Sequence, residues 1–199
     1  MPQPAANRWV LLIHQIPPKP DYFRVKVWRR LQRLGAVAIK NSVYVLPRSD
    51  ETVEDLQWQM REIVAGGGEA SLCEANFVDG LTDTEIEALF RTARDADYRD
   101  IVADAQRLLK ALPGGRRART DGRGQIKADV GRLKRRLADV VAIDFFGAPR
   151  RRPAHEELAR LETRLRPPNP EVPAPADPAQ APRVTNVAPP GAQVSCSPL

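Results

Sequence analysis

Short apolar runs alternate with amphipathic stretches over the first 75 residues of the chain. Residues 9–16 (WVLLIHQI) form an apolar run that ends at two prolines, which predicts a buried strand followed by a rigid turn. Two shorter runs rich in β-branched residues, at 36–40 and 42–46, predict a hairpin. A fourth strand is predicted at residues 69–75.

Two amphipathic helices are predicted between these strands. The first begins at Asp21, which suits a helix cap, and runs to Leu34 before Gly35 ends it. The second covers about residues 50–65 and ends in three consecutive glycines. The order β-α-β-β-α-β, with both helices on one side of a four-stranded antiparallel sheet, predicts an α+β protein with a ferredoxin-like unit at residues 9–79.

The pattern becomes purely helical from residue 80 to residue 166. Thr82 and Glu85 have the spacing of a capping box, and a last short helix is predicted near residues 154–165. A Gly- and Arg-rich stretch at 113–124 predicts a flexible basic connector. Apolar residues four and three apart follow it and predict the seam of a helical hairpin or of a dimer: Ile126, Val130, Leu133, Leu137 and Val140.

The last segment, residues 167–199, has a different composition. Ten of its 33 residues are proline and almost none are large and apolar, which predicts a disordered tail. The tail carries one net negative charge, so the formal charge of +6 for the whole chain becomes +7 for the rest. No stretch approaches the ~18 apolar residues that cross a membrane, and a cytoplasmic protein is therefore expected.

Candidate catalytic chemistry is sparse. The two histidines, His14 and His155, have no serine or cysteine nucleophile with an acidic partner at a recognisable spacing. Cys73 lies in a predicted strand and is expected to be a small buried residue, and with Cys196 it forms neither a disulfide framework nor a zinc site. The sequence therefore predicts no enzyme, no metal site and no cofactor.

A cationic side on the first helix is the stronger signal. At ~100° per residue, Val27, Trp28 and Leu31 fall on an apolar side, which is expected to face the core. The opposite side carries four cations that we call the basic stripe: Lys26, Arg29, Arg30 and Arg33. The basic stripe is either a nucleic-acid-binding surface or an ordinary solvated helix face.

Arg24 is a second candidate, because it falls on the apolar side of the same helix. An unpaired charge there is costly, so Arg24 needs a carboxylate, a carbonyl or an anion as partner, unless its side chain extends to solvent from the first turn. We expect it to be an anion-binding residue. Further arginines offer supplementary phosphate contacts or are solvated: Arg116, Arg117, Arg119, Arg123, Arg150, Arg151 and Arg152.

Several runs together resemble a known family. WVLLIHQIPPKPDYFRVKVWRRLQRLGAVAIKNSVYVLP, EIVAGGGEASLCEANFVDGL and ARDADYRDI resemble the N-terminal domain family of the chromate-resistance regulator ChrB, over about residues 9–165. The resemblance implies a cytoplasmic, chromate-responsive transcriptional regulator of a chromate-efflux operon. Longer members of that family carry a further C-terminal domain, whereas this chain has the proline-rich segment there.

The strand–helix unit also resembles the ferredoxin-like nuclease of CRISPR adaptation and the related domain of the phenylacetate-pathway repressor. In the nuclease, an aspartate before Ile-Pro holds a metal between paired subunits. The corresponding residue here is Gln15, and a neutral amide is a poor ligand for a hard metal ion. The resemblance therefore implies the fold, and His14 with Gln15 is expected to end a core strand.

Three hypotheses follow for function. The first is a non-enzymatic, DNA-associated regulator of a chromate-resistance operon, in which a homodimer presents the arginines to DNA phosphates. The second is a degenerate metal-dependent nuclease-like domain, which requires acidic residues near Gln15. The third is a module that binds chromate itself, without DNA, through arginines and backbone N–H groups.

Overall fold

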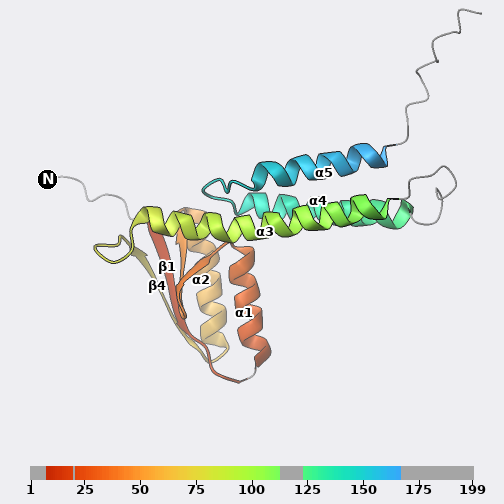
Figure 1. Cartoon of the computed structure of the whole chain (residues 1–199). Helices are drawn as coiled ribbons and strands as arrows, with labels where there is room; N and C mark the ends of the chain where they lie inside the picture. Colours follow the sequence, from red (N-terminus) through yellow and green to blue (C-terminus); the bar gives the residue numbers. More distant parts are fainter. Residues whose placement is uncertain (1–7, 20, 113–122, 167–199) are drawn as a thin grey trace, which may run out of the picture. The chain divides into compact units, whose positions relative to one another are not determined.

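The computed structural model describes residues 8–19, 21–112 and 123–166, and Figure 1 shows the arrangement of their elements. The strands are β1 (Trp9–Gln15), β2 (Val37–Lys40), β3 (Val43–Pro47) and β4 (Glu69–Ala75). The helices of these ranges are α1 (Asp21–Arg33), α2 (Asp50–Ala65), α3 (Asp83–Ala111), α4 (Arg123–Ala142) and α5 (Arg151–Leu165). The predicted element order is confirmed.

The strands form a single antiparallel sheet in the order β2-β3-β1-β4. β1 lies in its centre, where Leu12 is opposite Tyr44 of β3 and Leu72 of β4. Helices α1 and α2 lie side by side along one face of the sheet (Figure 1). This strand order, with both crossover helices on one face, is the ferredoxin-like arrangement that the sequence predicted.

β1 is buried on both faces over its first four residues, although neighbouring side chains of a strand point in opposite directions. On one face, Val10 and Leu12 contribute to the core beneath α1 and α2. On the other face, the Trp9 ring stacks on Phe90 of α3, with ring centroids 6.1 Å apart. This cover is incomplete at the far end of the strand, where Ile13 is 44% exposed.

Polar contacts also join the start of α3 to β1. The Trp9 indole Nε1–H donates to Asp83 Oδ1 at 2.6 Å, and Arg8 forms ion pairs with Asp83 and Glu87. The predicted capping box is present, since the Thr82 hydroxyl accepts from the backbone N–H of Glu85 while the Glu85 carboxylate accepts from the Thr82 N–H. These contacts fix where the long helix α3 begins.

Glycines end α1 and α2 in the same way. Gly35 has φ +75°, its N–H donates to Gln32 O at 3.0 Å, and the N–H of Ala36 donates to Leu31 O at 3.0 Å. This is the Schellman motif, in which a left-handed residue lets two N–H groups turn back to the last carbonyls of a helix. The predicted stop at Gly35 is confirmed, and Gly67, with φ +81°, ends α2 by the same motif.

Helices α3, α4 and α5 pack together around a second apolar core. The predicted seam of α4 is buried there, with exposed fractions between 4% for Leu137 and 8% for Ile126. Of the two alternatives for this seam, packing within the chain is the one found, and α5 joins the predicted hairpin. Within the described ranges, every helix is too short or too polar to cross a membrane.

The predicted burial of Cys73 is wrong. Cys73 is an exposed free thiol, because its strand β4 directs it to the sheet face that α1 and α2 do not cover. The predictions of a flexible connector at 113–124 and of a disordered tail at 167–199 concern segments that lie almost entirely outside the described residues.

Candidate nucleic-acid interface

The rotation of α1 against the sheet decides which of its side chains reach solvent. Phe23, Val27 and Leu31 are its buried residues, and they form a line four residues apart along the helix. Trp28 is 52% exposed, so the prediction that it packs in the core is wrong. The sequence placed the buried side of α1 on Val27, Trp28 and Leu31. In the structure α1 is rotated about its axis so that Phe23 takes the place of Trp28 on the buried side, because the Phe23 ring fills space beside Gly66.

Two members of the basic stripe contact α2. Lys26 Nζ lies 2.6 Å from Glu62 Oε1, and Arg30 lies 3.5 Å from Asp55 Oδ1. The hydrogen bond to Glu62, together with the charge of that carboxylate, raises the pKa of Lys26. In both pairs the cation is exposed and the carboxylate is half-buried, and pairs this open to solvent are weak. They place the two cations on the side of α1 that faces α2.

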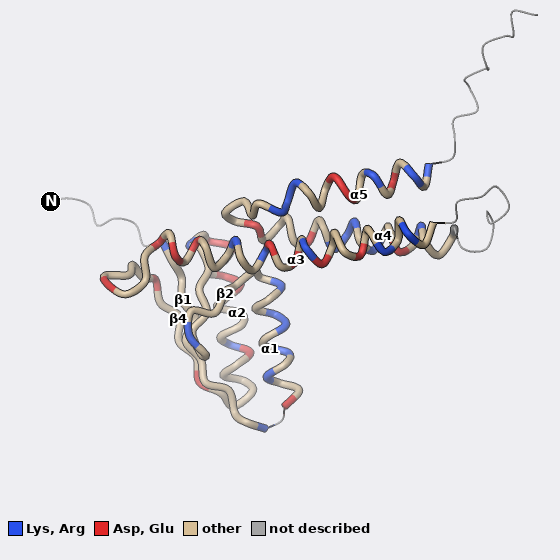
Figure 2. Tube along the Cα trace, in the orientation of Figure 1, with Lys and Arg blue, Asp and Glu red and all other residues tan. Residues whose placement is uncertain are grey.

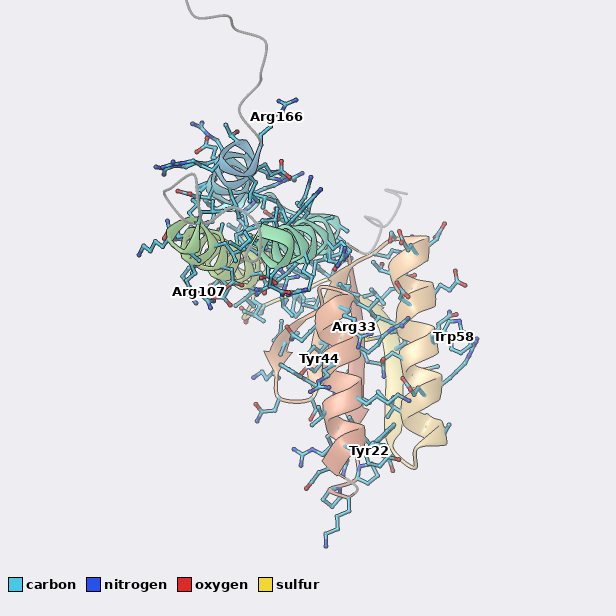
Figure 3. The ribbon with its side chains drawn as sticks, turned by 90° about the vertical axis from the view of Figure 1, so that its right-hand side faces the viewer. Tyr22, Arg33, Tyr44, Trp58, Arg107 and Arg166 are labelled. Atoms are coloured by element: carbon cyan, nitrogen blue, oxygen red, sulfur yellow. The ribbon has the colours of Figure 1, made fainter. Side chains whose placement is uncertain are left out.

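The other two members of the basic stripe lie on the part of α1 that its buried line of Phe23, Val27 and Leu31 leaves exposed. Arg29 and Arg33 are exposed and lie four residues apart, so they share one face of α1. Neither forms an ion pair within the described part of the chain, whereas most arginines of the helical bundle do. Figure 2 shows the cationic positions along α1, and Figure 3 labels Arg33 on that helix.

Tertiary packing adds two neighbours that the sequence did not predict. Between α1 and α2 a hollow of about 460 Å³ brings Arg30 next to Arg61 and Trp58. Trp58 is 63% exposed and Figure 3 shows it on the outer side of α2. The sequence could not predict this neighbourhood. The hydrophobic pattern of α2 separates core residues from exposed ones, but it does not show that Arg61 and Trp58 lie beside α1. They extend the cationic surface from α1 onto α2.

Arg24 is exposed, so its side chain lies outside the core although its position falls on the apolar side of α1. Within the described ranges no carboxylate lies within ion-pair distance of it, and of the predicted alternatives the one found is a side chain that extends to solvent from the first turn. It lines a different hollow, on the side of α1 that faces β3, and so does not share the outward face of Arg29 and Arg33.

The supplementary arginines divide into two groups. Arg150, Arg151 and Arg152 lie at the start of α5, where Arg152 Nε is 2.7 Å from Glu156 Oε1. Those at 116, 117 and 119, and the side chain of Arg123, lie outside the described residues. The structure therefore brings none of the described ones together with the basic stripe.

The end of β1 is the place where a metal site would resemble that of the nuclease. Gln15 lies opposite Glu69 of β4, a single carboxylate. Across residues 8–19, 21–112 and 123–166, no three histidine, cysteine or acidic side chains are grouped so that they would hold a metal ion. The acidic convergence that the nuclease hypothesis requires is not found among them.

The fold and the surface together define a small α+β protein with a ferredoxin-like unit, a helical bundle and an exposed cationic helix. The family model for the N-terminal region of Protein ChrB matches residues 24–168, and the chain belongs to that family. The predicted family is therefore confirmed, and with it the link to chromate resistance at the level of the family.

A curated relative agrees with this assignment. Protein ChrB of Cupriavidus metallidurans is 26% identical to this chain over 128 residues, which are 62% of this chain and 40% of the relative. The chain thus spans about two fifths of that protein's length. No solved structure was found to match it.

Proposed function

We propose that the protein is a non-enzymatic, DNA-associated transcriptional regulator in chromate resistance, acting in the cytoplasm. The observation that carries this proposal is the pair Arg29 and Arg33, which are exposed on one face of α1 with no ion-pair partner in the described part of the chain. An unpaired guanidinium keeps its charge and its hydrogen-bond donors available for a phosphate.

The neighbouring cations support the same surface. Lys26 and Arg30 are exposed cations that pair with half-buried carboxylates of α2, and pairs open to solvent on one side are weak enough for a phosphate to replace the carboxylate. Arg61 contributes a further charge beside Arg30. Contacts of this kind position a protein on the DNA backbone, and they carry no sequence information by themselves.

A homodimer fits this proposal, because two copies of α1 would double the number of phosphate contacts on one duplex. The α4 seam is buried within the chain and is not free for this purpose. The other described residues leave the sheet face around Ile13 and Cys73 exposed, and this face is the surface we assign to the dimer contact. In this proposal chromate is the signal that changes the occupancy of the operator.

Binding to the DNA upstream of the protein's own gene tests the proposal, measured by fluorescence anisotropy over a series of salt concentrations. The double variant Arg29→Gln/Arg33→Gln is expected to bind more weakly and to lower the slope of log affinity against log salt by about 1.8, which is about 0.9 for each phosphate contact. An unrelated duplex should show the same loss, because phosphate contacts do not depend on sequence.

A charge-matched control is available on α5. Arg160→Gln/Arg164→Gln removes two exposed arginines from the bundle and should leave affinity and slope as in the parent. If the α1 double variant is folded and keeps the parent's affinity and salt slope, the basic stripe is only a solvated helix face. Chromate is also added to the complex of the unmodified protein with its DNA, to test whether chromate is the signal. If the affinity for DNA does not change, chromate is not the signal.

A further inference from the structure

A hollow of about 450 Å³ lies between α1, the end of β1 and the β2–β3 hairpin. Figure 3 shows Tyr44, one of its lining residues, beside α1 on the side away from α2. The volume lies within the ~300–1,000 Å³ typical of small-molecule sites. Apolar side chains form most of its wall: Ile16, Val25, Val27, Trp28 and Leu31.

Exposed apolar surface gathers at this hollow. Trp28 is 52% exposed and Val25 is 44% exposed, and both line it. A large apolar side chain left in contact with water forgoes the ~25 cal/mol per Å² that burial would contribute. Two such side chains on one wall form a surface that an apolar ligand would cover.

The imidazole of His14 is a second unexplained feature. It lies at the hollow, with its ring stacked on Tyr44 at a centroid distance of 5.6 Å. Both of its nitrogens are shielded from solvent and have no hydrogen-bond partner among the described residues. Buried polar atoms in proteins are nearly always hydrogen-bonded, so an imidazole without partners indicates that a group is missing beside it.

Arg24 is the positively charged residue of this hollow. It lines the same hollow and has no ion pair within the described ranges, while Asp21, one turn earlier on α1, is the carboxylate of the lining. A guanidinium binds a carboxylate through two parallel hydrogen bonds. One cation opposed by one aspartate suits a singly charged ligand better than a dianion.

We infer that this hollow is a binding site for a small organic monocarboxylate with a planar or branched apolar body. The carboxylate would bind Arg24, and the body would cover Trp28 and Val25. The ligand edge would lie against the His14 ring near Asn41, and that ring must turn before its shielded nitrogens can bond to the ligand. A tetrahedral inorganic dianion fits poorly, because apolar walls cannot replace its hydration and Arg24 is the one cation among the described lining residues. The inference is independent of DNA binding, which uses another face of α1.

Benzoate is the probe for this site, because it joins a carboxylate to a planar apolar ring. Benzyl alcohol is the neutral analogue of similar shape, and sulfate is the tetrahedral dianion without oxidising power. Each is titrated into ¹⁵N-labelled full-length protein while the amide, Arg24 Nε–H and His14 ring resonances are followed. Benzoate is expected to shift the Arg24 and His14 signals in one saturable process, whereas sulfate is not.

Arg24→Gln should raise the dissociation constant for benzoate about tenfold and leave that for benzyl alcohol unchanged, because one charge-assisted contact of ~1.4 kcal/mol is lost. Lys40→Gln, a nearby exposed cation outside the lining, is the matched control and should change neither. Equal benzoate affinity in the Arg24 variant would overturn the inference. So would sulfate binding as tightly as benzoate, or no saturable benzoate binding at all.

Discussion

Three glycines at helix ends allow backbone strain and steric crowding to be separated in one experiment. Gly67 has φ +81°, and a Cβ added there would meet nothing within 4 Å. Gly66 has an ordinary φ of −81°, but an added Cβ would lie 2.2 Å from the Phe23 ring. Gly35 combines both features, with φ +75° and an added Cβ only 2.7 Å from Ile143 Cβ. Alanine therefore adds backbone strain alone at Gly67, steric crowding alone at Gly66, and both at Gly35.

The expected losses of stability follow from these geometries. A left-handed backbone costs an L-residue about 1–2 kcal/mol, so Gly67→Ala should lose about that much. Overpacking typically costs about 1–3 kcal/mol, which is the range expected for Gly66→Ala. Gly35→Ala should lose roughly the sum, about 2–5 kcal/mol, because a Cβ contact to another Cβ cannot be relieved by rotating a side chain. The entropy that alanine removes from the unfolded chain is similar for all three and cancels on comparison.

Urea unfolding followed by circular dichroism gives the free energies of unfolding, and an unchanged m-value shows that the same transition is measured. Phe23→Leu should reduce the loss caused by Gly66→Ala and leave the loss caused by Gly67→Ala unchanged, since a smaller side chain makes room at only one of the two sites. If Gly35→Ala costs no more than Gly67→Ala, Ile143 does not pack against the end of α1. The contact between the ferredoxin-like unit and the bundle at that point would then be refuted.

Two further predictions concern buried ionisable groups. Burial lowers the pKa of His14 in the folded state, so the unfolded chain binds more protons between pH 6.5 and that lowered pKa. The contribution of His14 to stability should therefore be constant above about pH 6.5, fall as the pH drops toward the lowered pKa, and level off below it. His14→Gln should flatten the dependence of the free energy of unfolding between about pH 7.5 and 5.5, and an unaltered slope would contradict this. Asp97→Asn should destabilise the protein more than Arg94→Met, because it leaves the buried Arg94 guanidinium without the carboxylate 2.9 Å from its Nε. The reverse order in urea unfolding would show that the guanidinium is well solvated.

The sequence by itself determined the elements that depend on local chemistry. The glycine at the end of the first helix and the Thr82–Glu85 capping box act within a few residues, and both were predicted correctly. The β-α-β-β-α-β order was also predicted, because strand and helix periods differ and short antiparallel connections leave few topologies. The family followed from the same runs of residues.

The tertiary structure decided which faces are covered and by what. Helical period places Trp28 beside the apolar side of α1, but only packing of Phe23 against the sheet and Gly66 turns Trp28 outward to line a hollow with Arg24. Strand alternation divides β4 into two faces without saying that Cys73 lies on the uncovered one. Arg61 and Trp58 lie beside Arg30 only because α2 packs against α1. That packing is driven by burial of apolar surface between helices distant in sequence, which no local pattern of residues reveals.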